Sequence, residues 1–140
     1  MRKLLGIGFV LILWSCQDSN QLKTDETLSK KIETGFNSKT TIVDLTQLNR
    51  FDWDELIILG PYSLIENVES SLNLNLENIK ENKIKMEDSM NLIIFLNKKK
   101  SVKICELSRI NGDFIKLKQI IEKAKAKFVK TEKGHIKLMD

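Results

Sequence analysis

The sequence predicts an α+β fold, in which a small, mainly antiparallel sheet carries one or two helices packed on one face. Three observations support this class. Short runs rich in Ile, Leu, Val and Phe alternate with turn-forming residues, as in a sheet of short strands. One segment after such a run has apolar residues at helical spacing. Two pairs of runs are separated by only a few polar residues, which is typical of antiparallel hairpins.

The first residues form a secretory signal pattern. Two basic residues precede an apolar run over residues 4–14, and Ser15 is followed by Cys16. A basic start, an apolar stretch of about eleven residues and a small residue before the cleavage point are the parts of a signal peptide. The run is too short to cross a bilayer as a helix, which takes about 20 residues. Residues 1–15 are therefore expected to be a processing segment.

The end of this segment indicates where the protein is located. Leu-Trp-Ser-Cys at residues 13–16 resembles the lipobox of bacterial lipoproteins, with Leu13 and Ser15 at its most restrictive positions. The resemblance implies that Cys16 receives a diacylglycerol thioether, becomes the new N-terminus after cleavage and is acylated again, as with palmitate. Two or more acyl chains hold a protein stably on a membrane. The protein is thus expected to be lipid-anchored in the bacterial cell envelope, with inner and outer membrane both open.

Composition limits the remaining classes. Cleavage leaves about 125 of the 140 residues, enough for one domain with one modest core. The formal net charge of +4 includes two residues of the signal segment, and the remaining charges of both signs are interspersed. A balance of roughly +2 is too small for a nucleic-acid partner. The sequence therefore predicts one domain over residues 39–140 and leaves the oligomeric state open.

Residues 16–38 are predicted to be the lipidated cysteine followed by a polar tether. Their only spaced apolar residues are Leu28, Ile32 and Phe36, a narrow stripe that predicts a weak helix. Thr24 or Asp25 would cap that helix. A polar stretch of this length supplies the spacer that a lipid-linked domain needs.

The first folded elements follow this tether. Strands are expected at residues 41–45 and 55–59, and the second is apolar enough to be buried on both faces. Ser63 with Glu66 three residues later forms a capping-box pattern before a helix over residues 64–72. The apolar residues of this helix share one face, which is expected to pack on the sheet.

The second half contains two expected hairpins. Residues 73–89 are rich in Asn, Lys and Glu and are interpreted as a surface connection. Strands at 90–96 and 102–107 are joined at three consecutive lysines, interpreted as a solvated turn rather than a phosphate site. Strands at 127–130 and 135–138 form the closing hairpin.

The segment between these hairpins allows two interpretations. Apolar residues at helical spacing behind Asp113 favour a helix that runs to Phe128. A strand over residues 112–117 is the alternative.

Cysteine chemistry is limited by the lipid anchor. If Cys16 is acylated, no disulfide can form within the chain, because only one other cysteine is present. Cys105 lies in an apolar run and is expected to be a small buried hydrophobe. A catalytic thiol would need His135, the only histidine, and this pair is the less favoured reading.

The densest motif is Phe-Asp-Trp-Asp-Glu at residues 51–55, which leads through the apolar strand to Gly-Pro-Tyr at 60–62. This arrangement resembles a group of small bacterial proteins, several of them secreted or lipid-anchored, over about residues 41–130. The resemblance implies the fold and carries over no activity. The candidate binding surface consists of Phe51, Asp52, Trp53, Asp54 and Tyr62.

Four interpretations of this motif remain open: glycoside hydrolysis, calcium binding, sugar stacking and a purely structural role. Asp52 and Asp54 form a possible carboxylate pair for glycoside hydrolysis. With Glu55 they form a possible set of oxygen ligands for calcium. Trp53 and Tyr62 are candidates to stack on an envelope sugar. The favoured reading is structural: Trp53 and its neighbouring phenylalanine close the edge of the core, and one of the two aspartates caps a turn.

The sequence favours a non-enzymatic role. It contains no Gly-x-Ser-x-Gly elbow, no P-loop, no His-Glu-x-x-His and no Cys-x-x-Cys, and it implies no cofactor and no metal site. The leading hypothesis is a protein-binding or assembly module that acts on an envelope protein partner while Cys16 holds it on the membrane. The alternatives are an envelope glycan or small-ligand binder, or weak hydrolase, at the same motif, and an immunity-type lipoprotein.

Overall fold

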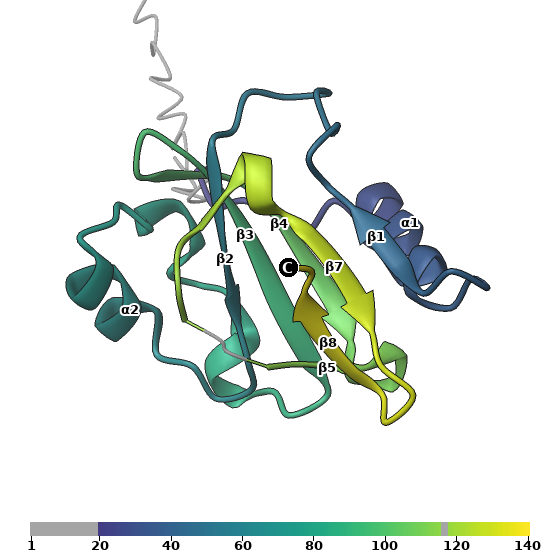
Figure 1. The fold of residues 1–140 in the computed structure, drawn as a ribbon. Helices are drawn as coiled ribbons and strands as arrows, with labels where there is room; N and C mark the ends of the chain where they lie inside the picture. The colour runs from purple at the N-terminus through teal and green to yellow at the C-terminus, as the bar shows by residue number, and fades with distance from the viewer. Residues whose placement is uncertain (1–19, 116–117) are drawn as a thin grey trace, which may run out of the picture.

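The computed structural model describes residues 20–115 and 118–140. Within these residues the chain forms two α-helices and eight strands, arranged in two mostly antiparallel sheets (Figure 1). The predicted α+β class is confirmed. The strands are divided between two four-stranded sheets instead of lying in one.

The central sheet has the strand order β4-β3-β2-β6, and all its neighbours are antiparallel. Its strands are β2 (Glu55–Leu59), β3 (Met90–Asn97), β4 (Lys100–Ser108) and β6 (Ile121–Glu122). The second sheet has the order β1-β7-β8-β5, in which only β5 and β8 are parallel. Its strands are β1 (Ile42–Asp44), β5 (Asp113–Phe114), β7 (Lys127–Lys130) and β8 (His135–Leu138).

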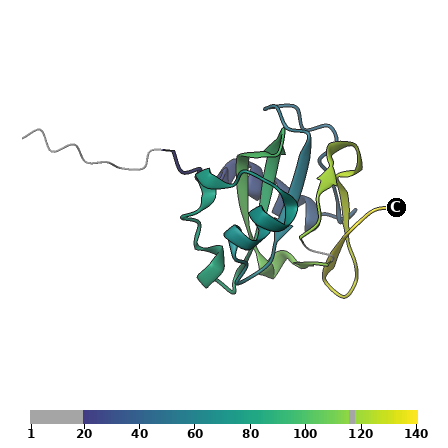
Figure 2. The same ribbon diagram turned by 90° about the vertical axis from the view of Figure 1, so that its left-hand side faces the viewer.

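The central sheet is covered on both faces, which explains why β2 and β3 are almost wholly apolar. Successive side chains of a strand point to opposite faces. In β2, Leu56 and Ile58 belong to the core shared with the second sheet, and Ile57 and Leu59 belong to the core under α2 (Ile65–Leu72). Figure 2 shows α2 towards the viewer and the yellow strands of the second sheet on the right. The prediction that this strand is buried on both faces is confirmed.

The tether prediction for residues 17–38 is wrong over α1 (Glu26–Phe36). The three apolar residues of its stripe, Leu28, Ile32 and Phe36, are all buried in the core shared by the two sheets. α1 packs against β4 and β1. Three large side chains on one face bury enough apolar surface to dock the helix, so the folded domain includes it.

α1 begins at the cap that the sequence indicates. The Asp25 side chain accepts a hydrogen bond from the Leu28 amide (2.9 Å), and its second oxygen accepts one from the Lys103 ammonium (3.0 Å). The Leu28 amide and the Lys103 side chain lower the pKa of Asp25. A lowered folded-state pKa stabilises the fold at pH values above the ordinary carboxyl pKa of 3.8. That contribution is lost as the pH falls through the folded-state value.

Substitution Asp25→Asn is therefore expected to destabilise the domain at pH 7 and to have a smaller effect at pH 3. Asparagine keeps the helix cap but loses the charge that faces Lys103, a loss of about 1 kcal/mol. Urea unfolding of both proteins at the two pH values measures the difference. Equal differences at pH 7 and pH 3 would show that the Asp25 charge contributes nothing.

Residues 73–89 are not merely a surface connection. They contain the short helices η1 (Glu77–Ile79) and η2 (Lys83–Met86). They also bury four apolar side chains against the central sheet: Leu74, Leu76, Ile79 and Ile84. The prediction failed because the segment is polar overall and these four buried residues follow neither a helical nor a strand period. They complete the layer that α2 is too short to cover alone.

The helix predicted behind Asp113 is wrong. The alternative strand is confirmed over β5, and residues 116–117 at its end lie outside the described residues. Gly112 has φ 130° and directs the chain into β5, which pairs with β8. Lys118 has φ 67°, a left-handed conformation that interrupts any helix, and its amide donates to the Ile58 carbonyl (3.2 Å). The described parts of this segment pair with strand edges instead, β5 with β8 and β6 with β2.

The remaining secondary-structure predictions are confirmed with one change. Both hairpins form at the expected positions. α2 begins after Leu64, but no side chain caps it. The Ser63 hydroxyl instead donates to the Gly60 carbonyl (2.7 Å), which closes the preceding turn, so the capping box is not formed.

Candidate functional site

Trp53 is a core residue and not an exposed stacking surface. Only 4% of its surface is exposed, and its indole N–H donates to the Leu48 carbonyl (2.8 Å). Its ring meets the Phe95 ring edge-on with centroids 5.0 Å apart, and the Lys123 ammonium lies 5.1 Å from its centroid. Phe51 is partly buried beside the same Phe95 ring. Sugar stacking on Trp53 is thus contradicted.

The acids of the motif do not converge on one point. Asp54 accepts a hydrogen bond from the Lys98 amide (3.2 Å) at the β3–β4 turn. Glu55 binds the Lys99 ammonium (3.0 and 3.3 Å). Asp52 lies on the exposed side of the chain. In residues 20–115 and 118–140 no three acids, histidines or cysteines meet in a way that could hold a metal ion. The geometry therefore favours neither a calcium site nor a paired-carboxylate hydrolase.

The motif borders a shallow, mostly polar depression of about 430 Å³. It is lined by Asn49, Phe51, Asp52, Trp53, Asn97, Lys98 and Lys123. The Lys123 ammonium binds the Asn49 side-chain oxygen (2.8 Å) and thereby closes one side of the depression. Tyr62 is not part of it, because β2, about 17 Å long, separates Tyr62 from Trp53. The five residues of the predicted surface therefore belong to two places.

Tyr62 is held in an unusual conformation with its ring in solvent. It has φ 60°, in the left-handed region, and 59% of its surface is exposed. The left-handed conformation costs a residue with a side chain about 1–2 kcal/mol. The Tyr62 amide donates to the Ile84 carbonyl (3.0 Å), which fixes this turn against η2. A strained backbone that projects a large aromatic ring outward is more typical of a functional position than of a packing one.

A groove of about 270 Å³ lies beside this ring. Its α2 side presents apolar and small polar residues, and Lys118 lines it as well. The full lining is Tyr62, Leu64, Asn67, Val68, Ser71, Leu72 and Lys118. Tyr62 and Lys118 are distant in sequence, and both have positive φ, so the two strained residues flank one groove. We call this the α2 groove.

Other exposed apolar side chains lie at the same end of the central sheet as Tyr62. Leu64 is half exposed, Met86 of η2 is largely exposed, and Ile110 of η3 (Arg109–Asn111) is 93% exposed. Hydrogen bonds connect the loops that carry them. Arg109 donates from its backbone to the Ser89 carbonyl and from its guanidinium to the Asp88 carbonyl. This end of the molecule therefore presents several apolar side chains on a fixed framework.

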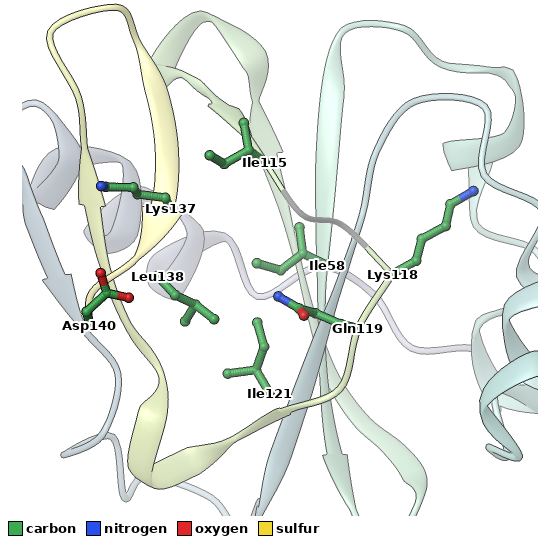
Figure 3. A pocket seen from close by; sticks show the side chains of 8 residues that line it. All are labelled: Ile58, Ile115, Lys118, Gln119, Ile121, Lys137, Leu138 and Asp140. Carbon is green, nitrogen blue, oxygen red and sulfur yellow. The ribbon is translucent and has the colours of Figure 1, made fainter.

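A second opening separates the two sheets near the C-terminus (Figure 3). It has a volume of about 310 Å³, and its apolar lining comes from Ile58, Ile115, Ile121 and Leu138. Figure 3 shows that the Lys118 side chain turns away from this opening. Lys118 also lines the α2 groove, so its ammonium is available to an occupant of that groove.

Cys105 and His135 are not brought together. Cys105 is completely buried in the central sheet, as predicted, and burial raises the pKa of its thiol to about 12. His135 lies exposed at the start of β8 in the second sheet. A thiol that stays protonated at neutral pH is a poor nucleophile. Cys105 therefore acts as a packing residue.

Sequence reasoning identified Tyr62 but missed its partners in the α2 groove. Residues such as Asn67 and Ser71 follow the helical period of α2, but they carry no functional signature. Lys118 was assigned to a helix, so nothing in the sequence placed it beside Tyr62.

Comparison with protein families, with curated proteins and with solved structures finds no match to this chain. No helix in the described part of the chain is long and apolar enough to cross a membrane. The signal segment and the predicted lipidation site Cys16 lie outside the described residues.

Proposed function

We propose that the protein is a lipid-anchored protein of the bacterial cell envelope that works by contact, as a protein-binding or assembly module. The α2 groove and the neighbouring Tyr62 ring are its contact surface. The observation that carries this proposal is the exposed Tyr62 ring, held beside the groove by a left-handed backbone. Tyrosine is enriched among the few residues that dominate binding energy at protein interfaces.

The shape and charge of the groove define the partner. Leu64, Val68 and Leu72 offer an apolar floor for one or two side chains, while Asn67 and Ser71 offer hydrogen bonds at the rim. Lys118 is the only charged residue in the lining. An envelope protein segment with an apolar side chain next to an acidic one complements this surface.

Substitution Tyr62→Asn is expected to abolish partner capture without loss of stability. Asparagine tolerates a left-handed backbone, so the thermal midpoint should remain equal or rise slightly while the ring is lost. The measurement is photo-cross-linking in intact cells, with a photoreactive amino acid at Leu64 and identification of the captured protein. The anchored wild type should capture one defined protein.

Lys98→Asn provides the matched control. Lys98 is also exposed and has φ 50°, but it lies at the opposite end of the central sheet, in the β3–β4 turn. It should relieve the same kind of strain and leave capture unchanged. If Tyr62→Asn captures the partner as well as Lys98→Asn does, the ring is not the contact. If the wild type captures no defined protein, the contact function itself is wrong.

A further inference from the structure

The first described residues are hydrogen-bonded to the rest of the domain only a few residues after Cys16, the predicted anchor. The Gln21 side chain donates to the Glu77 carbonyl (3.0 Å) and accepts from the Glu81 amide (3.1 Å). The Leu22 amide donates to the Asn78 carbonyl (2.7 Å). Three hydrogen bonds therefore hold the N-terminal segment against the domain from Gln21, the second described residue, onward.

Two of the next residues, Thr24 and Asp25, pair with the outer edge of β4 in the central sheet. Thr24 forms a parallel bridge with Ile104 of β4, and the Asp25 amide donates to the Ile104 carbonyl (2.9 Å). The Thr24 hydroxyl also accepts a hydrogen bond from the Glu106 amide (2.8 Å). The N-terminal segment therefore occupies the outer edge of β4 and cannot extend the tether without breaking these contacts.

The chain length between Cys16 and Gln21 sets a maximum distance. Five residue steps separate them, and a fully extended chain spans at most about 3.6 Å per residue, or about 18 Å in total. A domain of this size is about 30–35 Å across. Because the tether is shorter than the domain, an acylated Cys16 would keep the β4 edge next to the bilayer.

We infer that the domain lies on the membrane with its β4 edge towards the lipid, so that the α2 groove faces away from it. The surface that contacts the membrane is the edge around Gln21, η1 and Glu81, and its occupant is the bilayer that holds the acyl chains. This inference rests on the lipid anchor of the proposed function.

The strand order determines what the opposite side presents. The central sheet runs β4-β3-β2-β6, and the Lys118 amide bonds to the outer edge of β2. Lys118 is therefore four strand spacings, about 19 Å, from the segment that pairs with β4. In Figure 2 the first described residues, in purple, and the C-terminus lie on opposite sides of the molecule. A partner could approach the groove without displacing the domain from the membrane.

Charge on the β4 edge does not supply this orientation. The exposed charged side chains there include Lys23, Lys100, Glu77 and Glu81. Lys103 and Lys80 are already paired with carboxylates. A surface of mixed sign is attracted only weakly to anionic lipids. The short tether alone fixes the orientation, so raised salt should not change it.

Fluorescence quenching in vesicles tests the inference on the full-length acylated protein. Glu81→Cys and Lys118→Cys each introduce one reactive thiol for a dye, because Cys105 is buried and Cys16 is blocked by the thioether. The vesicles are phosphatidylcholine with a nitroxide on a fraction of the head groups. The dye at position 81 should be quenched roughly twofold or more strongly than the dye at 118, at low and high salt.

A flexible Gly/Ser insert of about 20 residues after Asp18 is the control, because it should remove the difference between the two positions. Equal quenching at both positions in the natural-length protein would overturn the orientation while leaving the anchor intact. Vesicle flotation identifies the other failure. If the wild type floats no better than Cys16→Ala, the lipid anchor of the proposed function is wrong, and the orientation falls with it.

Discussion

Substitution of Phe36 by alanine is expected to destabilise the domain by about 3–5 kcal/mol, the cost of removing a large aromatic side chain from a packed core. Phe36 is one of the largest fully buried side chains, and its ring meets Phe114 edge-on with centroids 5.9 Å apart. Phe114 in turn contacts Phe128. The substitution therefore leaves a cavity where α1 joins the second sheet.

Urea unfolding at neutral pH measures this loss. The matched control is Lys30→Ala on the exposed side of the same helix, which should change stability by less than about 0.5 kcal/mol. If Phe36→Ala were as stable as Lys30→Ala, α1 would be the loose tether that the sequence suggested. A loss of this size would be comparable to half of the total stability of a typical small domain.

Substitution of Trp53 by alanine is expected to cost a similar amount, about 3–5 kcal/mol, and to act on stability rather than on binding. The indole packs edge-on against Phe95, and its N–H satisfies the Leu48 carbonyl. Removal of the ring leaves a cavity at the end of the central sheet and a partly buried carbonyl without its partner.

Trp53→Phe separates the two contributions, because it keeps most of the packing and loses only the indole N–H. Its expected cost is about 1–2 kcal/mol, measured by the same unfolding experiment. Where Trp53→Phe remains folded, partner capture through the α2 groove should equal that of the wild type. Selective loss of capture in stable Trp53→Phe would instead place a contact surface at the motif.

The local pattern was sufficient for elements whose apolar residues follow one period and whose partners are close in sequence. β2 and β3 consist of nearly continuous apolar runs, and β3 and β4 are joined by a short turn at Lys98 and Lys99. α2 has all its apolar residues on one face. In these cases the pattern of buried residues is decided locally, and for the β3–β4 hairpin the backbone pairing is decided locally as well.

The same reasoning failed where a segment serves several partners. Phe114, Ile121 and Phe128 have helical spacing, yet they lie in three different strands of two sheets. Periodicity shows that residues are buried, but it cannot show which backbone supplies their hydrogen bonds. The unpaired edge of β2 and the parallel partner β8 decided that question in favour of extended chain.

For the candidate site, too, the sequence indicated some features and only the tertiary structure decided others. The sequence singled out Trp53 and Tyr62 because aromatic residues near acids are rare and conspicuous, and it could not tell which ring is buried. Burial depends on Phe95 for the first and on the turn against Ile84 for the second, and both lie far along the chain.

By itself, the sequence determined the α+β class, most of the strands, α2 and the prediction of a lipid anchor, because those depend on local composition and period. Only the tertiary structure decided that α1 belongs to the core, that the strands divide into two sheets, and that Tyr62 and Lys118 share one groove. The physical reason is that contacts between distant segments depend on the shape of the whole core and on which sheet edges remain unpaired. A local sequence pattern contains no information about the shape of the core or about the unpaired sheet edges.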